Sequence, residues 1–272
     1  MKLPDPLLQV GRLARTRLKK WRHAGGRYAC SVCGARVAYF LPLPPIYAET
    51  MQKHGAIHPI DRYETLNLQA YACPICEASD RERLYALFWR EHHGAHPANS
   101  GSPLRVIDFS PSAAFSTFMR KLPNVDYRSA GYRATSPHID DHLADLTNLE
   151  NYPDDSFDAF VCSHVLEHVS DAESGARELY RITKATGIGI VMVPIALDLN
   201  ENLEDPRWTS EAERWKHYGQ GDHVRLFSKS GFRSLLERAG FHLEELGEKH
   251  FRAATFQRHA ISSRSVLYVV TK

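Results

Sequence analysis

Residues 144–194 decide the fold and read ADLTNLENYPDDSFDAFVCSHVLEHVSDAESGARELYRITKATGIGIVMVP. An apolar strand is predicted over 157–162, a helix over 172–183 and a second apolar strand over 187–194. Four polar residues follow the first strand directly: Ser163, His164, Glu167 and His168. Polar side chains therefore collect at the carboxyl end of a buried strand, which is where open α/β sheets bind ligands.

The same alternation of strand and helix continues on both sides of this stretch. Helices are predicted over 80–91, 112–121 and 228–239. Further strands are predicted over 104–109, 126–130, 142–146, 241–246 and 266–271. This order predicts an α/β fold with a largely parallel sheet and helices on both faces.

Four of the five cysteines form two Cys-x-x-Cys pairs: Cys30, Cys33, Cys73 and Cys76. One such turn places two sulfurs on one side of an ion, and a second turn closes the other side, so the set predicts a structural zinc site. The segment 34–72 between the pairs is long for a zinc ribbon and must carry an insertion. An iron–sulfur cluster, or thiols that never meet, are the alternatives.

The organisation predicted from these patterns has four parts. A basic amphipathic helix fills 1–26, a four-cysteine zinc-binding module 27–91, a polar Gly/Pro-rich linker 92–103, and an α/β domain 104–272. The basic helix either docks on its own domain or a partner chain, or rests on an anionic membrane surface or polymer.

Composition bounds the class of protein. The chain has 272 residues, a formal net charge of +2, 43% hydrophobic and 24% charged residues, as in ordinary globular proteins. No apolar run approaches the roughly 18 residues that cross a bilayer, and no secretory signal is present. We expect a cytoplasmic protein, with the basic helix as a possible contact to the inner membrane face.

The central stretch resembles one branch of the class I S-adenosylmethionine (SAM)-dependent methyltransferases. The matching residues are Asp145, Tyr152-Pro153, Asp155, Ser156-Phe157-Asp158, His164 and Leu166-Glu167-His168-Val169. The resemblance runs from about residue 104 to the C-terminus. It implies a Rossmann-like sheet, SAM as cofactor and a lid insertion over 195–226.

The resemblance also implies which residues bind the cofactor. Asp108 keeps the acid of the family's first turn, whereas Ser110 and Ser112 stand where glycines are common. Gly131 stands where the family usually has the acid that binds ribose, so ribose binding would rest on Ser129, backbone groups or water, or SAM affinity is weak or lost. The remaining matches to cofactor contacts are Asp145, Leu146 and Ser163.

On the acceptor side, imidazoles that titrate near neutrality make His164 and His168 candidate bases, with Glu167 as an orienting group or a packing residue. The lid sequence 219–226 resembles a family stretch that closes over the active site. It offers Asp222, His223 and Arg225 as base, proton shuttle and anion clamp, unless an Asp–Arg pair only staples the loop.

The resemblance implies a methyltransferase that moves a methyl group from SAM to an O or N atom. The acceptor would be a small molecule, a glycan or a lipid-linked compound. Two alternatives stay open. One is an RNA methyltransferase that binds RNA through the zinc ribbon and basic terminus. The other is a catalytically inactive binding or scaffold protein, which the missing glycines and ribose acid favour.

Overall fold

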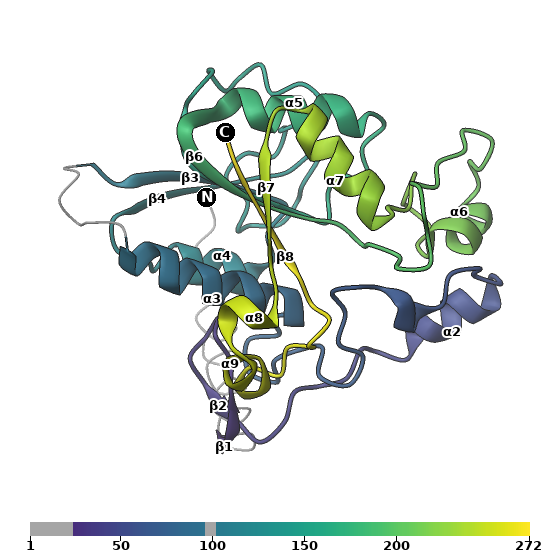
Figure 1. Ribbon diagram of the computed structural model, residues 1–272, viewed down its shortest axis with the longest axis horizontal. Helices are drawn as coiled ribbons and strands as arrows, with labels where there is room; N and C mark the ends of the chain where they lie inside the picture. Colours follow the sequence, from purple (N-terminus) through teal and green to yellow (C-terminus); the bar gives the residue numbers. More distant parts are fainter. Residues whose placement is uncertain (1–23, 96–101) are drawn as a thin grey trace, which may run out of the picture.

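A mixed six-stranded sheet runs through the centre of the computed structural model, which describes residues 24–95 and 102–272 (Figure 1). The strand order is β4-β3-β5-β6-β8-β7, and only β8 runs antiparallel to its neighbours. The strands are β3 (Leu104–Phe109), β4 (Val125–Ala130), β5 (Phe157–Ser163), β6 (Thr183–Met192), β7 (His242–Leu246) and β8 (Leu267–Thr271). The predicted parallel-dominated α/β sheet is confirmed.

Helices cover both faces of this sheet (Figure 1). The helices on one face are α3 (Asp80–Ala95) and α4 (Ala113–Met119), and those on the other are α5 (Ala172–Ile182) and α7 (Lys229–Arg238). Side chains of Ser112, Asp171 and Ser228 cap α4, α5 and α7 by accepting backbone N–H groups of the first turn. Each helix therefore begins where a short polar side chain precedes an apolar-periodic run.

The register of the parallel strands fixes where the polar residues meet. Phe109 lies opposite both Ala130 and Cys162. The residues that follow these three, Ser110, Gly131 and Ser163, therefore emerge at one edge of the sheet. This edge is the carboxyl end at which ligands bind in open α/β sheets.

The strand predicted over 142–146 does not form. The segment makes only isolated bridges, those of Leu143 with Tyr132 and of Asp145 with Asn148. The Asp141 carboxylate accepts the N–H of Leu143 at 3.0 Å, and the Asp145 carboxylate accepts the N–H of Thr147 at 2.9 Å. These local side-chain bonds favour turns over a continuous ladder.

The cysteine pairs belong to a small module below the sheet in Figure 1. Its hairpin consists of β1 (Ala24–Ala29) and β2 (Arg36–Val37), and its insertion holds α2 (Ile46–Lys53) and the 3₁₀ turn η1 (Ile60–Arg62). The hydrophobic core runs without a break from Cys30 and Phe40 of this module through Leu84 of α3 to Ile107 of β3. Module and sheet therefore share one core.

Because the core is shared, the predicted boundary between the cysteine module and the linker, at residues 91 and 92, does not separate two structural units. The predicted linker 92–103 begins inside α3, which continues to Ala95 and packs with the sheet. Linker residues 96–101 lie outside the described residues, as do residues 1–23 of the predicted basic helix. Residues 24–26, the end of that predicted helix, belong instead to β1. Leu84, Tyr85 and Trp89 of α3 are almost fully buried, so this helix is part of the shared core.

Arg83 joins the module to the C-terminal part of the chain. Its buried guanidinium donates to five backbone carbonyls, those of Ala70, Tyr71, Ala78, His259 and Ala260. The last two follow the short helices α8 (Glu248–Phe251) and α9 (Ala253–Arg258). A buried charge is tolerated here because every N–H direction finds an acceptor.

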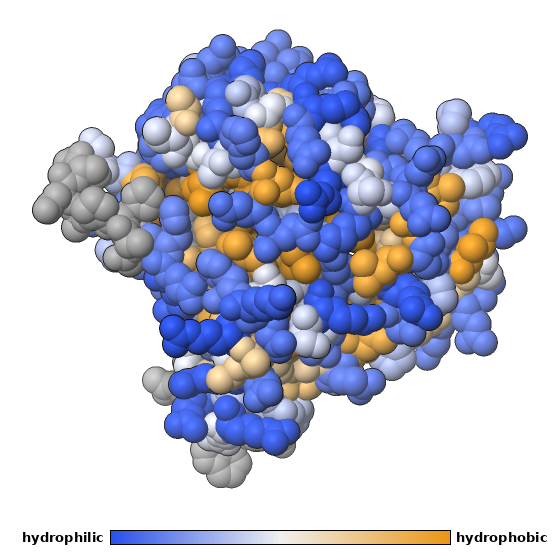
Figure 2. Space-filling model, in the orientation of Figure 1, coloured by the Kyte–Doolittle hydropathy of each residue, from blue (hydrophilic) through white to orange (hydrophobic). Residues whose placement is uncertain are grey.

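The outer surface is mostly hydrophilic on the side shown in Figure 2, with apolar residues gathered across the middle, where β7 and β8 cross in Figure 1. Within residues 24–95 and 102–272, no helix combines the length and the apolar character that crossing a membrane requires.

Candidate functional site

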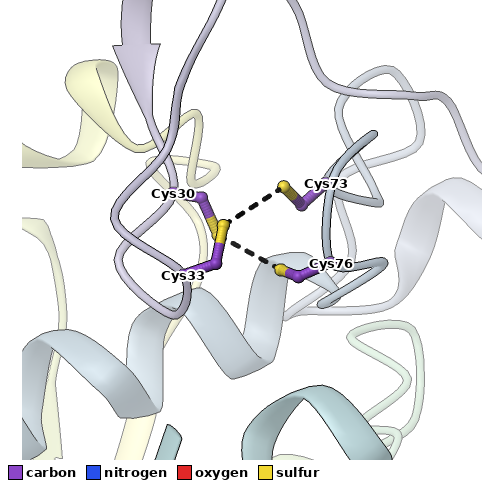
Figure 3. A group of neighbouring side chains, drawn as sticks. All are labelled: Cys30, Cys33, Cys73 and Cys76. Carbon is purple, nitrogen blue, oxygen red and sulfur yellow. Dashed lines mark hydrogen bonds between the residues drawn. The ribbon is translucent and has the colours of Figure 1, made fainter. Parts of the chain in front are cut away.

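The four paired cysteines converge at one point (Figure 3). Cys30 Sγ lies 3.7 Å from Cys76 Sγ, Cys33 Sγ lies 4.0 Å from Cys73 Sγ, and all four sulfurs are within 4.8 Å of one another. Sulfurs bound tetrahedrally at about 2.3 Å from zinc lie about 3.8 Å apart, so the spacing fits such an ion without rearrangement. The predicted grouping is confirmed, and its occupation by zinc remains a prediction.

The two cysteine turns have the same backbone design. The N–H of Cys30 donates to Ala35, and the N–H of Cys73 donates to Ala78, each at 2.9 Å. The residue after each second cysteine is left-handed, with φ of +74° at Gly34 and +68° at Glu77. The repeated turn presents two sulfurs from each side, which is the arrangement a closed structural metal site needs.

The predicted cofactor residues at the ends of β3 and β5 line one cavity of about 290 Å³. These residues are Asp108, Ser110, Ser112 and Ser163. Ser110 has φ of +56°, the left-handed conformation that glycine adopts most easily, so the turn survives the loss of its glycines. Ser112 caps α4 and donates to Glu82, and the hydroxyl of Ser163 is hydrogen-bonded to Tyr85.

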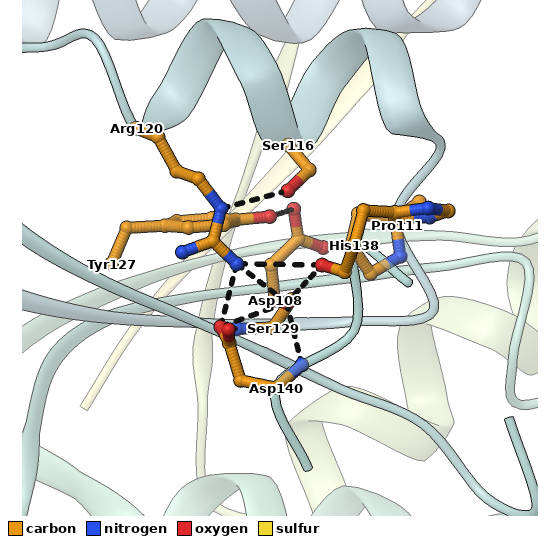
Figure 4. Close-up of polar contacts among 8 residues, drawn as sticks. All are labelled: Asp108, Pro111, Ser116, Arg120, Tyr127, Ser129, His138 and Asp140. Carbon is orange, nitrogen blue, oxygen red and sulfur yellow. Dashed lines mark hydrogen bonds and ion pairs between the residues drawn. The ribbon is translucent and has the colours of Figure 1, made fainter. Parts of the chain in front are cut away.

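Asp108 is a buried acid at the base of this cavity. It accepts a hydrogen bond from the Tyr127 hydroxyl at 2.8 Å. Burial raises the pKa of Asp108 well above its ordinary value, although the Tyr127 hydrogen bond opposes this. Figure 4 shows that the two side chains meet beside the polar contacts at the end of β4.

Ser129, one of the predicted ribose contacts, takes part in the polar contacts at the end of β4 (Figure 4). The fully buried Ser129 hydroxyl donates to the His138 carbonyl at 2.7 Å and lies 2.9 Å from the Asp140 carboxylate. Arg120 binds both Ser129 and Asp140. Burial alone would raise the pKa of Asp140, but hydrogen bonds from Ser129 and Arg120 outweigh it and hold that pKa below its usual value. Ser129 thus has a structural role and does not line the cavity.

The other three predicted cofactor contacts lie outside the cavity walls. Gly131 donates its N–H to Asp141, and a Cβ added to it would come within 3.5 Å of Ser110 Oγ. Asp145 accepts the N–H and the hydroxyl of Thr147, and Leu146 is buried in the core. A contact of Gly131, Asp145 or Leu146 with the cofactor remains a prediction.

A second cavity, of about 380 Å³, lies beside the first and shares with it Tyr71, Arg81, Ser110 and Ser163. Four of the predicted catalytic residues line it: His164, His168, Asp222 and His223. The structure therefore places the cofactor edge and the predicted acceptor residues in two adjacent cavities that have four wall residues in common.

The polar end of this second cavity is organised around Glu167, which is fully buried. His164 Nδ1 lies 3.2 Å and His168 Nε2 lies 4.0 Å from Glu167 Oε1. The other nitrogen of His168, Nδ1, lies 3.3 Å from Asp222 Oδ2. The His168 and His223 rings meet edge to face with centroids 4.7 Å apart.

Burial and neighbouring charges set the protonation of this group. Burial lowers the pKa of His164, and the charge of Arg81 adds to the effect. Burial likewise lowers the pKa of His223, to about 4. Burial alone would raise the pKa of Glu167, but the adjacent histidines outweigh it and bring that pKa to about 2. Near neutral pH, Glu167 is ionised and the imidazoles of His164 and His223 are free to accept a proton.

Arg225 does not serve as the predicted anion clamp. Its buried guanidinium donates to the carbonyls of Leu166, Val169 and Ser170 and pairs with Glu204 at 2.8 Å. All of these partners are groups of the protein itself, and the three carbonyls belong to the turn that carries Glu167 and His168. Arg225 therefore fixes this turn. The predicted Asp–Arg staple is wrong as well, because the partner of Arg225 is Glu204 and Asp222 lies beside His168.

The insertion in the cysteine module forms a wall of the pocket, which sequence reasoning missed. Its apolar and aromatic side chains line the second cavity: Leu43, Tyr47, Met51, Ile60, Tyr63 and Leu66. Only the unusual length of the segment between the cysteine pairs pointed to an added role. Arg81, at the start of α3, also lines both cavities and carried no sequence signal.

The insertion also contacts the predicted lid, whose helix is α6 (Glu211–Tyr218). In Figure 1, α2 and α6 face each other beside the sheet. Ile57 donates its N–H to the Lys216 carbonyl at 2.9 Å, and the His54 ring stacks on Trp215. The pocket is therefore enclosed by two segments that are far apart in sequence.

Comparisons with known proteins agree with this architecture. A 2-methyl-6-phytyl-1,4-hydroquinone methyltransferase of rice is 24% identical over 62% of this chain and 48% of its own length. A probable S-adenosylmethionine-dependent methyltransferase of Mycolicibacterium smegmatis is 27% identical over 48% of each chain. The chain thus spans about half the length of the curated relatives it matches.

Among solved structures, a SAM-dependent methyltransferase from Mesorhizobium loti aligns at 17% identity with a TM-score of 0.42, covering 68% of this chain and 98% of that one. One from Archaeoglobus fulgidus aligns at 15% identity with a TM-score of 0.42, covering 71% and 93%. The family model described as a methyltransferase domain matches residues 81–246, more than half of the chain. The protein belongs to the methyltransferase-domain family.

Proposed function

We propose that the protein transfers the methyl group of SAM to an oxygen or nitrogen atom of a small, largely apolar acceptor. The observation that carries this is the adjacency of the two cavities, which share the wall residues Tyr71, Arg81, Ser110 and Ser163. SAM, when bound, supplies an electrophilic methyl group on a sulfonium. Ser110, Ser112 and Ser163 would hold it at the edge of the sheet, where the left-handed Ser110 leaves the backbone open to a ligand.

The walls of the second cavity favour a ring-bearing acceptor over a glycan. Tyr47, Tyr63, Tyr71 and Tyr218 supply aromatic faces, and Leu43, Met51, Leu66, Val193 and Ile195 supply apolar contacts. The aromatic and apolar part of this lining can bury a flat ring, and polar residues of the same cavity such as Arg81, Gln220 and Asp222 can bind the substituents of that ring. The rice relatives act, by name, on a hydroquinone with a phytyl chain, which has the same combination of a ring, hydroxyls and an apolar substituent.

At the polar end of the cavity, His164 is the candidate base. Its Nδ1 faces Glu167, which would orient the ring and stabilise it once protonated. The lowered pKa of His164 keeps the imidazole neutral and ready to take a proton from an acceptor hydroxyl or amine. His168, whose Nδ1 faces Asp222, is the second candidate for this role.

Zinc in the cysteine cluster (Cys30, Cys33, Cys73 and Cys76) would have a structural role in this proposal. The cluster provides four sulfur ligands and no open position. Metal binding would tie the two cysteine turns together and so hold the insertion that forms the pocket wall. The expected effect of zinc is on folding and acceptor binding, with no part in the methyl transfer itself.

A binding protein without activity is the competing function, and the end of β4 favours it. Ser129 is occupied by Asp140 and Arg120, and Gly131 offers no carboxylate to a ribose. The ribose hydroxyls therefore lack the partner that the family usually provides. Direct measurement of SAM binding separates the two functions.

The deciding experiment is calorimetric titration of the purified, zinc-loaded protein with SAM and with S-adenosylhomocysteine. Micromolar binding of both is expected. Ser110→Trp would fill the shared part of the two cavities and should weaken binding by at least about tenfold, or 1.4 kcal/mol. Thr186→Trp is the matched control, because Thr186 is exposed near the opposite end of β6.

Absence of SAM binding to folded wild-type protein would contradict the enzyme and support the binding protein. If SAM binds, transfer of a labelled methyl group to a panel of ring hydroxyl and ring amine compounds is the next measurement. Methylation of RNA or of a glycan, with no transfer to ring compounds, would contradict the proposed acceptor class.

A further inference from the structure

We propose that Glu167, His168 and His223 form a binding site for a divalent transition-metal ion at the polar end of the second cavity. One ligand atom from each residue lies within 4.8 Å of the other two. This histidine–glutamate cluster is separate from the cysteine cluster. The site goes beyond the proposed function and can be tested without any methyl transfer.

The first observation is a buried carboxylate without a hydrogen bond. Both oxygens of Glu167 are buried, and neither accepts a hydrogen bond of ordinary geometry. Among the described residues, its ion-pair contacts within 4.0 Å are to the imidazoles of His164 and His168. A buried carboxylate without a close Lys or Arg partner is costly, and a bound cation would remove that cost.

The second observation concerns His223, which comes from the lid and is 5% exposed. Its Nδ1 is buried and has no hydrogen-bond partner. Both Glu167 and His223 therefore carry unpaired polar atoms within the same small space. Ligands about 2.1 Å from a metal lie about 3 to 3.5 Å apart, so side-chain movements of about 1 Å would complete the site.

The third observation is the orientation of His168. Its Nε2 faces Glu167, whereas its Nδ1 lies 3.3 Å from the carboxylate of Asp222. A carboxylate behind the second ring nitrogen is the usual support of a metal-binding histidine, because it fixes the tautomer and the ring orientation. Asp222 therefore becomes a positioning residue for the metal ligand.

The backbone holds the three ligands in place. The N–H of Val224, next to His223, donates to the carbonyl of Glu167 at 2.9 Å. Arg225 binds the carbonyls of Leu166 and Val169 on either side of Glu167 and His168. These links join the lid to the turn after β5, and such prior ordering favours a metal site over a chance meeting of side chains.

The donor set indicates the class of metal. Two imidazoles and one carboxylate favour Zn²⁺, Co²⁺, Fe²⁺ or Ni²⁺ over Mg²⁺ and Ca²⁺, which prefer oxygen ligands alone. Three protein ligands leave coordination positions free. Because His168 and His223 line the second cavity, those positions would face the acceptor. Only this last role, in holding an acceptor oxygen or nitrogen, rests on the proposed function.

The test is titration of zinc-loaded protein with CoCl₂, followed by elemental analysis of the protein after gel filtration. Wild type should bind about one cobalt per chain while it retains the zinc of the cysteine cluster. His168→Ala, His223→Ala and Glu167→Gln should each weaken cobalt binding by at least about tenfold, and Asp222→Asn by about tenfold. His242→Ala, at an exposed position on β7, should change nothing.

Circular dichroism and zinc content establish that each variant is folded. If a buried variant unfolds, Asp222→Asn still decides, because the Asp222 side chain is 66% exposed and its loss should not unfold the protein. No uptake of cobalt beyond the zinc, or uptake unchanged in Asp222→Asn and in a folded His223→Ala, overturns the inference. SAM binding without cobalt uptake overturns the metal site and leaves the proposed function standing. Cobalt uptake without SAM binding overturns the proposed function and leaves the metal site standing.

Discussion

The cysteine cluster and the histidine–glutamate cluster differ in how the fold assembles them. Each half of the cysteine cluster is a short turn that presents two sulfurs by itself, and the four sulfurs lie at the spacing that zinc requires. The histidine–glutamate cluster takes two residues from the turn after β5 and one from the lid. The first offers four sulfurs and no open position, whereas the second offers three ligand atoms beside a pocket. The comparison therefore sets a predicted structural metal site against a proposed open one.

The largest effect should come from the cysteine cluster. Cys73→Ala removes one sulfur from a buried site and is expected to destabilise the module by about 5 kcal/mol or more, because zinc binding and folding of such modules are coupled. Thermal melting and hydrogen exchange over residues 24–95 measure the loss. His168→Ala, at a side chain that is 30% exposed, should change the free energy of unfolding by about 1 kcal/mol or less. Equal losses of unfolding free energy in Cys73→Ala and His168→Ala would contradict the predicted difference between the two clusters.

The two clusters also show what the sequence could and could not predict. The Cys-x-x-Cys pairs are a local pattern, and the meeting of their four sulfurs was predicted correctly. The strand that precedes the Leu-Glu-His turn was also predicted correctly from its local apolar run. Convergence of Glu167, His168 and His223 depends on the lid returning to the turn after β5, which no local pattern encodes. The role of the insertion as a pocket wall depends on packing between α2 and α6, and it was missed for the same reason.

The failed predictions have a common physical cause. Ser129 and Arg225 were chosen for their chemical type and their position in a motif. Asp140, Arg120 and Glu204 then engage these side chains in internal hydrogen bonds. The predicted strand over 142–146 fails because the carboxylates of Asp141 and Asp145 accept the backbone N–H groups of Leu143 and Thr147. Whether a polar side chain serves a ligand or the fold depends on partners that are distant in sequence.

A smaller but still large effect is expected at Arg83, which links the cysteine module to the C-terminal segment. Arg83→Met keeps the length of the side chain but removes the guanidinium hydrogen bonds to five backbone carbonyls. The expected loss is about 3 to 5 kcal/mol, the range for removing one partner from a buried charged network. Denaturant unfolding measures it, and Arg177→Met, at an exposed position on α5, is the control.

Arg83→Met also tests whether the cysteine cluster depends on the shared core. Zinc content should fall together with stability, because the guanidinium binds carbonyls on both sides of the second cysteine turn, those of Tyr71 and Ala78. Full zinc retention in a destabilised Arg83→Met protein would show that the cluster folds independently of the core. The module would then be a separate domain, as the predicted boundary implied.

The smallest effect is a pH dependence of stability that arises at His259, where the C-terminal segment meets β1. Burial lowers the pKa of His259 to about 4, and the nearby arginines Arg258, Arg83 and Arg90 add to this. The unfolded chain binds a proton at about pH 6.5, so the folded state loses stability as the pH falls from about 6.5 to 4 and keeps it above that range. The expected loss is on the order of 2 kcal/mol.

This loss of stability is measured by unfolding in urea at a series of pH values, with zinc content checked at each. His259→Gln should flatten the profile in this range, whereas His142→Gln, at an exposed position, should leave it unchanged. His259 lies beside β1 of the cysteine module. If variants of the histidine–glutamate cluster flatten the pH profile and His259→Gln does not, the pH-sensitive contact lies in the histidine–glutamate cluster and this prediction is wrong.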